Sequence, residues 1–259
     1  MGNRLTRRDI ADSLKALGLE RGDCVEVHSS LSSLGYVEGG ALTVIQALMD
    51  TVGEEGAIVM SAYRVTPPLP LSEDEKRKGI VAKVRFLEED ADEKTGMGMI
   101  ADTFRKLPGT CLGKGIHRVC AWGHNAHCHS QGYDYLLSLD GWVLLMGVGI
   151  NRCSCMHTAE DEIGLPDVIS EYFEPPENIR RQYPDTHWYI QYNDPHRSPP
   201  VDAWEKVRVE AERRGFIRRV RIGQAECLFF KARPMVAIYE NWLRKDPFGL
   251  FGVPKASSD

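Results

Sequence analysis

The sequence predicts an α/β protein with a mixed, mainly parallel central sheet that is flanked by helices. Three patterns favour this class. A strand-like run, a helix-like segment and a second strand-like run follow one another within residues 24–60, an order that is typical of a parallel βαβ unit. Residues 142–148 (WVLLMGV) are apolar on both faces, as a central buried strand is. Alternating polar and apolar residues in the last third indicate additional antiparallel strands.

The elements up to residue 60 are assigned in order along the chain. A first helix is expected to begin at a capping box of Thr6 and Asp9 and to end at Gly18. Strands are expected at 24–27 and 57–60. The helix between these two strands has one apolar face, which is formed by Leu42, Ile45, Leu48 or Met49, and Val52.

Residues 61–95 show no clean periodicity and carry several prolines and a charged run. A stretch of this length in a compact domain is usually a lid or a binding loop, so we expect a long active-site loop here. A helix is expected after Gly98, with Met99, Ile100 and Phe104 on one side. The remaining expected elements are strands at 119–122, 142–148, 187–192 and 216–222 and helices at 202–213 and 235–242. We treat residues 1–259 as a single domain.

Composition excludes several classes of protein. The chain has 259 residues, of which 42% are hydrophobic and 27% charged, and its formal net charge is −5. This balance excludes a disordered or fibrous chain, and an acidic protein is a poor candidate for binding nucleic acid. No apolar run is long enough to span a membrane. Seven cysteines without the spacing of a disulfide framework indicate a reducing compartment, so we expect a cytoplasmic protein.

A serine-rich turn, residues 28–35 (HSSLSSLG), follows the first strand. Ligands of α/β proteins bind at the carboxyl ends of the strands, and small hydroxylated residues there favour a phosphate or pyrophosphate. The alternative is a plain solvated loop. The turn taken alone favours that alternative, because neither a P-loop nor a G-x-G-x-x-G fingerprint is present.

His157 and Glu160 follow the buried run 142–148 and are spaced to share one face of a helix. A carboxylate beside an imidazole fixes its tautomer and raises its basicity, as a general base for an amine nucleophile requires. The alternative is the start of a surface helix, where acidic residues interact favourably with the helix dipole. The spacing alone is compatible with both interpretations.

A histidine-rich segment, residues 124–129 (HNAHCH), raises the question of a metal site. His124 and His127 have a helical spacing that suits metal ligands. No second ligand group accompanies them, so a solvated polar segment is the preferred interpretation and no metal is expected. The sequence also lacks a G-x-S-x-G motif, which leaves a hydrolase with a nucleophile elbow without support.

Five segments, taken together, resemble the aminoglycoside 3-N-acetyltransferase (antibiotic acetyltransferase) family. They stand in the family's order and at similar spacing: VHSSLSSLGYVEGG, TGMGMIADTFRKLPG, HRVCAWG, LDGWVLLMGVG and MHTAE. The resemblance is strong over residues 5–165 and weaker in the tail. Five ordered segments are far more specific than any one of them.

The resemblance implies a fold unlike that of the GNAT acetyltransferases and a transfer of acetyl from acetyl-CoA to the 3-amino group of a 2-deoxystreptamine ring. It implies small-molecule partners only, acetyl-CoA and a cationic aminoglycoside, with a homodimer left open. His157 and Glu160 match the family's H-x-A-E and would be the catalytic pair. Backbone N–H groups or a hydroxyl such as that of Thr158 are the candidate oxyanion donors. The implied cofactor-binding residues are His28, Ser29, Ser30, Leu31, Ser32, Ser33, Gly98, His117 and Val119. Tyr63 and Asp161 are the expected acceptor-binding residues.

Two segments depart from the family's pattern. Residues 112–115 (LGKG) stand where the family usually has Arg-Ser-x-His-Pro, and residues 61–68 lack its Asp-Pro and Trp and contain Arg64. Both departures concern the acceptor more than acetyl transfer. Two alternatives therefore stay open: an acetyltransferase of the same fold that acts on a different amine, and a CoA-binding module without activity on aminoglycosides.

Overall fold

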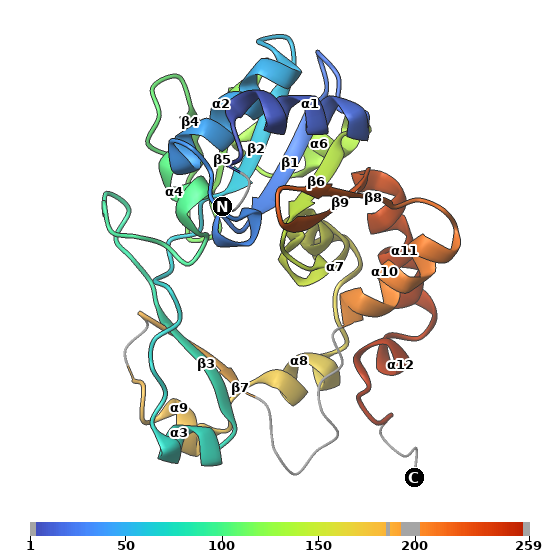
Figure 1. The fold of residues 1–259 in the computed structure, drawn as a ribbon. Coiled ribbons are helices and arrows are strands. Elements are labelled where there is room, and N and C mark those ends of the chain that lie inside the picture. Colours follow the sequence, from blue (N-terminus) through green and yellow to red (C-terminus); the bar gives the residue numbers. More distant parts are fainter. Residues whose placement is uncertain (1–3, 185–186, 193–202, 256–259) are drawn as a thin grey trace.

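The computed structural model describes residues 4–184, 187–192 and 203–255, and its centre is a seven-stranded mixed sheet (Figure 1). The strands stand in the order β4-β5-β2-β1-β6-β9-β8. Their bounds are Cys24–Ser29 (β1), Ala57–Ser61 (β2), Cys111–Leu112 (β4), Val119–Gly123 (β5), Trp142–Met146 (β6), Arg218–Ile222 (β8) and Ala225–Lys231 (β9).

The central strands run parallel and the outer pairings are antiparallel. β1 pairs in parallel with both β2 and β6, whereas β5 is antiparallel to β2 and to β4, and β9 is antiparallel to β6 and to β8. Consequently β4, β2, β1, β6 and β8 point one way, and only β5 and β9 point the other. The predicted mixed, mainly parallel α/β fold is confirmed. Of the two strands expected in the last third, 216–222 corresponds to β8, and β9, which was not among the expected elements, pairs with it.

Helices cover both faces of the sheet. One face is covered by α1 (Arg7–Leu17), α2 (Gly40–Val52) and α4 (Met99–Phe104). The opposite face is covered by α5 (Ala126–His129), α6 (Asp134–Ser138), α7 (His157–Ile163), α10 (Ala203–Arg213), α11 (Ala232–Lys245) and α12 (Pro247–Phe251). No helix of the described ranges is long and apolar enough to cross a membrane.

Alternating side chains of each strand divide the core into two layers. In β6, Leu144 and Met146 pack among the residues under α1 and α2, while Val143 and Leu145 pack on the α11 side. The capping box of Thr6 and Asp9 is present at the start of α1, as predicted. Most residues of the predicted apolar helix faces are buried, but Leu42 and Met99 are exposed. Asp202, the expected first residue of the helix at 202–213, lies outside the described residues.

Residues 61–95 are not the irregular loop that we expected. They contain α3 (Glu73–Arg77) and β3 (Ile80–Arg85), and β3 pairs with β7 (Trp188–Tyr192) in a separate two-stranded sheet. Together with α8 (Asp167–Phe173) and α9 (Glu177–Arg180), these elements form a part that stands apart from the central sheet in Figure 1. The expectation failed because β3 obtains its partner strand from about 100 residues further along the chain.

Candidate active site

A cleft of about 820 Å³ opens at the carboxyl ends of β1 and β6, the edge at which α/β sheets bind their ligands. Its walls come from the turn after β1, the segment before α4, the turn between β6 and α7, and the start of α10. The volume is in the range of cofactor and substrate sites. Of the residues predicted from the sequence, the cleft is lined by His28, Ser29, Ser30, Leu31, Ser32, Tyr63, Gly98 and His157.

His157, Glu160 and Tyr239 form a hydrogen-bonded chain at the cleft. His157 is the first residue of α7, and its Nδ1 lies 2.8 Å from Oε2 of Glu160. The hydroxyl of Tyr239, from α11, donates to Oε1 of the same carboxylate at 2.6 Å. Because a carboxylate only accepts, Nδ1 of His157 carries the proton, and Nε2 is left as the basic atom.

The electrostatics of this chain favour a basic imidazole. Partial desolvation lowers the pKa of His157, but the hydrogen bond and the charge of Glu160 outweigh it and raise the pKa above its usual value. Burial, followed by the charge of Glu160, strongly raises the pKa of Tyr239, so its hydroxyl remains a donor. The His157 side chain is 51% exposed and lies edge-on to Trp204, with ring centroids 4.8 Å apart, so an acceptor can reach it.

The serine turn is folded tightly onto the end of β6. The backbone N–H of Ser30 donates to the Met146 carbonyl at 2.9 Å, and the Ser33 hydroxyl donates to the Ser30 hydroxyl at 2.9 Å and to the Gly147 carbonyl at 3.2 Å. Ser33 therefore supports the turn, while Ser29, Ser30 and Ser32 line the cleft. The turn lies where a ligand would bind.

Gly98 lies at the opposite wall of the cleft, immediately before α4. Its φ of 92° is in the left-handed region, and a Cβ there would lie 3.7 Å from the Ser29 carbonyl oxygen. Glycine is needed for the backbone angle, which other residues rarely adopt. The serine turn and the segment that contains Gly98 therefore lie close together in the cleft.

Five of the predicted residues are not among those that line the cleft. Ser33 supports the turn and Glu160 is hydrogen-bonded to His157, as described above, and the other three are Val119, Asp161 and His117. Val119 is buried within β5 with 3% exposure, so its side chain packs in the core. Asp161 is exposed on α7. His117 is also exposed, and its ring lies 4.9 Å from that of Tyr63, which does line the cleft. Desolvation and the neighbouring charge of His157 lower the pKa of His117.

Two polar residues in β1 form a buried pair beneath the cleft. Nε2 of His28 lies 2.6 Å from Oε1 of Glu26, and the Glu26 side chain is fully buried. His28, expected as a cofactor contact, therefore also has a structural partner. Sequence patterns gave no indication of Glu26, because a single acidic residue in an apolar strand resembles an exposed position.

Other residues at the site were not expected from the sequence. Asn151, Arg152 and Ser154 line the cleft from the turn before α7, and Trp204 lines it from α10. Trp204 and Tyr239 occupy apolar faces of helices, a pattern that indicates packing alone. Arg152 is the one with a sequence signal, since a cation after a central strand suits an anionic ligand.

The histidine-rich segment does not form a metal site among the described residues. His124 and His127 are exposed, and the one group of three candidate metal ligands found in the described ranges lies elsewhere. His129 is fully buried with neither ring nitrogen hydrogen-bonded to a described residue. Desolvation lowers its pKa to about 4.

Comparisons with known proteins agree with this fold. The chain is 29% identical over 263 residues to the SPbeta prophage-derived aminoglycoside N(3')-acetyltransferase-like protein YokD of Bacillus subtilis (strain 168), with 92% of each chain covered. It is 28% identical over 269 residues to aminoglycoside N(3)-acetyltransferase VII of Streptomyces paromomycinus, covering 93% of this chain and 92% of that one. The structure of AAC-IIIb in binary complex with CoASH has the same fold, with a TM-score of 0.68 at 20% identity, covering 98% of this chain and 100% of that chain.

The match to a protein family extends over most of the chain. Residues 27–244 fit the family described as aminoglycoside 3-N-acetyltransferase. This range includes the serine turn, Gly98 and the chain from His157 to Tyr239. The protein thus belongs to the aminoglycoside 3-N-acetyltransferase family.

Proposed function

We propose that the protein is an acetyl-CoA-dependent N-acetyltransferase whose acceptor is the 3-amino group of the 2-deoxystreptamine ring of an aminoglycoside. The observation that carries the proposal is the hydrogen-bonded chain of Tyr239, Glu160 and His157, whose imidazole faces a cleft bounded by the serine turn. A positioned base beside a cavity of cofactor size is what direct acyl transfer to an amine needs.

His157 acts as the general base in this mechanism. Aminoglycoside amines are largely protonated at neutral pH, so a proton has to leave before nitrogen attacks. That first proton passes to solvent, and Nε2 of His157 takes a second proton as the neutral nitrogen forms a bond to the thioester carbonyl carbon. The carbon–sulfur bond then breaks, and the CoA sulfur leaves with its electron pair and takes that second proton from the His157 imidazolium. Glu160 orients the imidazole and stabilises its positive charge.

The acetyl-CoA site is assigned to the wall formed by the serine turn. Ser29, Ser30 and Ser32 line the cleft and offer hydroxyl donors, and Arg152 supplies a cation in the same cleft. A family structure that contains CoASH supports the choice of cofactor. His117 and Gly98 are retained as contacts of the cofactor, whereas Val119 supports the strand from within the core.

Thr158 does not provide the oxyanion donor. Its hydroxyl donates to the Cys155 carbonyl at 2.7 Å, so its proton is already used. The donor to the developing oxyanion must come from another group at the cleft, such as a backbone N–H of the serine turn.

The acceptor is the least constrained part of the proposal. Tyr63 lines the cleft, and Asp161 on the adjacent surface attracts a polycation. Arg152 also lines the cleft, and its positive charge repels a polycation. If the phosphates of CoA pair with Arg152, the aminoglycoside remains the favoured acceptor. If Arg152 is not paired in this way, it favours a second candidate, transfer to an amine that is not polycationic.

A turnover assay over a panel of acceptors tests both candidates. Thiol release from acetyl-CoA is measured with aminoglycosides that have a free 3-amino group, with the same compounds blocked at that amine, and with simple amines. We expect thiol release and a singly acetylated product with the first group alone, and none with the His157→Ala variant. Turnover of blocked aminoglycosides or simple amines instead would transfer the proposal to the second candidate, and no turnover of any amine would reject acetyl transfer.

A cytoplasmic location is proposed together with this activity. All seven cysteines are free thiols in the structure, which suits a reducing compartment, where acetyl-CoA is also present. A homodimer is left open.

A further inference from the structure

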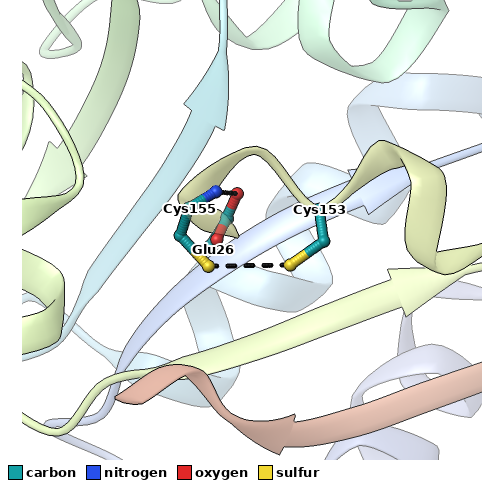
Figure 2. A group of neighbouring side chains, drawn as sticks. All are labelled: Glu26, Cys153 and Cys155. Carbon is teal, nitrogen blue, oxygen red and sulfur yellow. Dashed lines mark hydrogen bonds between the residues drawn. The ribbon is translucent and has the colours of Figure 1, made fainter. Parts of the chain in front are cut away.

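Three side chains that can bind a metal lie together beneath the cleft, in the interior of the protein. They are Glu26 of β1 and Cys153 and Cys155 of the turn that precedes α7 (Figure 2). All three are fully buried, and their candidate ligand atoms lie within 4.8 Å of one another. Neither the proposed acetyl transfer nor its acceptor requires this cluster.

The Glu26 carboxylate is held with one oxygen turned toward the two thiols. Oε1 accepts the backbone N–H of Cys155 at 3.1 Å and lies 2.6 Å from Nε2 of His28. Oε2 has no hydrogen-bond partner among the described residues and lies on the side of the Cys155 sulfur in Figure 2. A buried carboxylate oxygen without a hydrogen-bond partner is unfavourable, and a cation between Oε2 and the two sulfurs would compensate it.

The two sulfurs are spaced as in a thiolate site. The Sγ atoms of Cys153 and Cys155 are 3.6 Å apart. In tetrahedral coordination with Zn–S bonds of about 2.3 Å, two sulfurs are separated by about 3.8 Å. The carboxylate ligand atom of Glu26 lies within 4.8 Å of both sulfurs, so one cation can lie among the three side chains.

A redox pair is the competing interpretation of two neighbouring cysteines. Reactive thiols lie in partly exposed, electropositive surroundings, where their pKa is lowered. Here Cys153 and Cys155 are fully buried, so neither sulfur is open to an oxidant. The Glu26 carboxylate lies within 4.8 Å of both sulfurs, so the geometry favours metal binding over disulfide exchange.

We propose that Cys153, Cys155 and Glu26 bind a zinc-class divalent cation. Zinc accepts thiolate and carboxylate ligands together, and a water molecule takes the fourth position where the protein supplies three ligands. The cation would replace the thiol protons and pair with Oε2, while His28 and the Cys155 N–H hold the other carboxylate oxygen, an arrangement that orients a ligating carboxylate.

A metal bound at this site would link the turn at residues 150–156 to β1 through its ligands. Cys155 is two residues before His157, and Glu26 is in β1 beneath it. A metal at this point fixes the start of α7 and thereby the position of the base. The sequence predicted no metal, because Glu26 is 129 residues from Cys155 and C-x-C alone is not a zinc motif.

Metal content and cobalt substitution test the proposal on the full chain. The protein is purified without chelators, its zinc content is measured by elemental mass spectrometry, and Co²⁺ is then exchanged for zinc. We expect stoichiometric zinc and, with Co²⁺, the sulfur-to-metal charge-transfer absorption of a thiolate site. Cys153→Ser and Cys155→Ser should abolish that absorption and the zinc content, and Glu26→Gln should weaken zinc binding at least tenfold.

Cys227→Ser is the matched control, since Cys227 is equally buried but belongs to β9 outside the cluster. It should retain zinc and the cobalt spectrum. A strong chelator should lower the unfolding temperature of the wild type and of Cys227→Ser but not that of Cys153→Ser. Wild-type protein that contains no zinc and develops no sulfur-to-cobalt absorption would overturn the proposal even if the variants fail to fold. Zinc retained equally by the Cys153 and Cys155 variants would overturn it as well.

Discussion

Replacing His157 by alanine removes the proposed base and leaves the rest of the cleft in place. Among the described residues, the imidazole is hydrogen-bonded to Glu160 at 2.8 Å, and its side chain is 51% exposed. Truncation removes one hydrogen bond to a carboxylate, which contributes at most about 1.5–3 kcal/mol, so unfolding of the variant is measured beside its activity. A large loss of activity in a variant that stays folded therefore reports on chemistry and not on folding.

The expected loss follows from the role of the residue. A general base typically contributes about 10²–10⁴-fold, which corresponds to about 2.7–5.5 kcal/mol of activation free energy. We expect kcat to fall within this range and the Kd of acetyl-CoA to stay unchanged, because the cofactor contacts that we propose lie in the serine turn and not at His157. Wild-type kcat should fall as the pH decreases through the raised pKa of His157, since only the neutral imidazole accepts a proton. The variant should lack this acidic limb.

Thiol release under saturating substrates, measured from pH 5.5 to 9, provides the kcat values and the profile, and calorimetry provides the Kd. A variant that keeps near-normal kcat with the wild-type pH profile would refute His157 as the base. Glu160 would then be the first alternative. A variant with weakened acetyl-CoA binding and normal kcat would instead assign His157 to cofactor binding.

Three further predictions test neighbouring parts of the structure. Glu160→Gln should lower kcat less than His157→Ala and should move the acidic limb of the pH profile to lower pH, because the imidazole loses its negative neighbour. Tyr239→Phe should move the acidic limb to higher pH, because the Glu160 carboxylate loses a hydrogen-bond donor worth about 1.5–3 kcal/mol and interacts more strongly with His157. Equal shifts of both variants in one direction would contradict the hydrogen-bonded chain. The double variant Ser30→Glu, Ser32→Glu should weaken acetyl-CoA binding in calorimetry. Ser138→Glu, at an exposed position of α6, should leave this binding unchanged. Unchanged affinity in the folded double variant would place the cofactor site elsewhere. The pKa of His129 is lowered to about 4, so the unfolded chain binds the proton first as the pH falls. The free energy of unfolding should therefore decrease by up to about 3 kcal/mol between pH 6.5 and pH 4. Urea unfolding should show a weaker pH dependence in His129→Leu than in His127→Ala, and an identical dependence would refute the assignment.

Local sequence patterns predicted the elements that depend on near neighbours. The capping box of Thr6 and Asp9 and the apolar run 142–148 identified α1 and β6 because each signal lies within one element. The capping box of Ser72 and Glu75 at the start of α3 was equally readable but was obscured by the charged run around it. β3 was missed because its pairing with β7 is not encoded nearby.

The site was predictable to the extent that its residues are contiguous. The serine turn and the pair His157 and Glu160 each occupy one short segment. Spacing alone left two interpretations of each open, and the resemblance to a family selected between them. Tyr239 and Trp204 reach the same cleft from helices late in the chain, and their roles depend on tertiary packing that no single segment records. Val119 stays a prediction: its side chain lies in the core, so a contact with the cofactor would involve its backbone.

The pairing of β1 with both β2 and β6 has a consequence for the order in which activity arises during synthesis. Val25 of β1 pairs with Trp142 of β6, which is synthesised more than 100 residues later. Glu160 is hydrogen-bonded to Tyr239, which follows it by a further 79 residues. Contacts of such long sequence separation form slowly, and nascent chains meanwhile expose unpaired strand edges. The catalytic geometry is therefore a late product of folding, and no fragment that ends before α11 contains a complete active site.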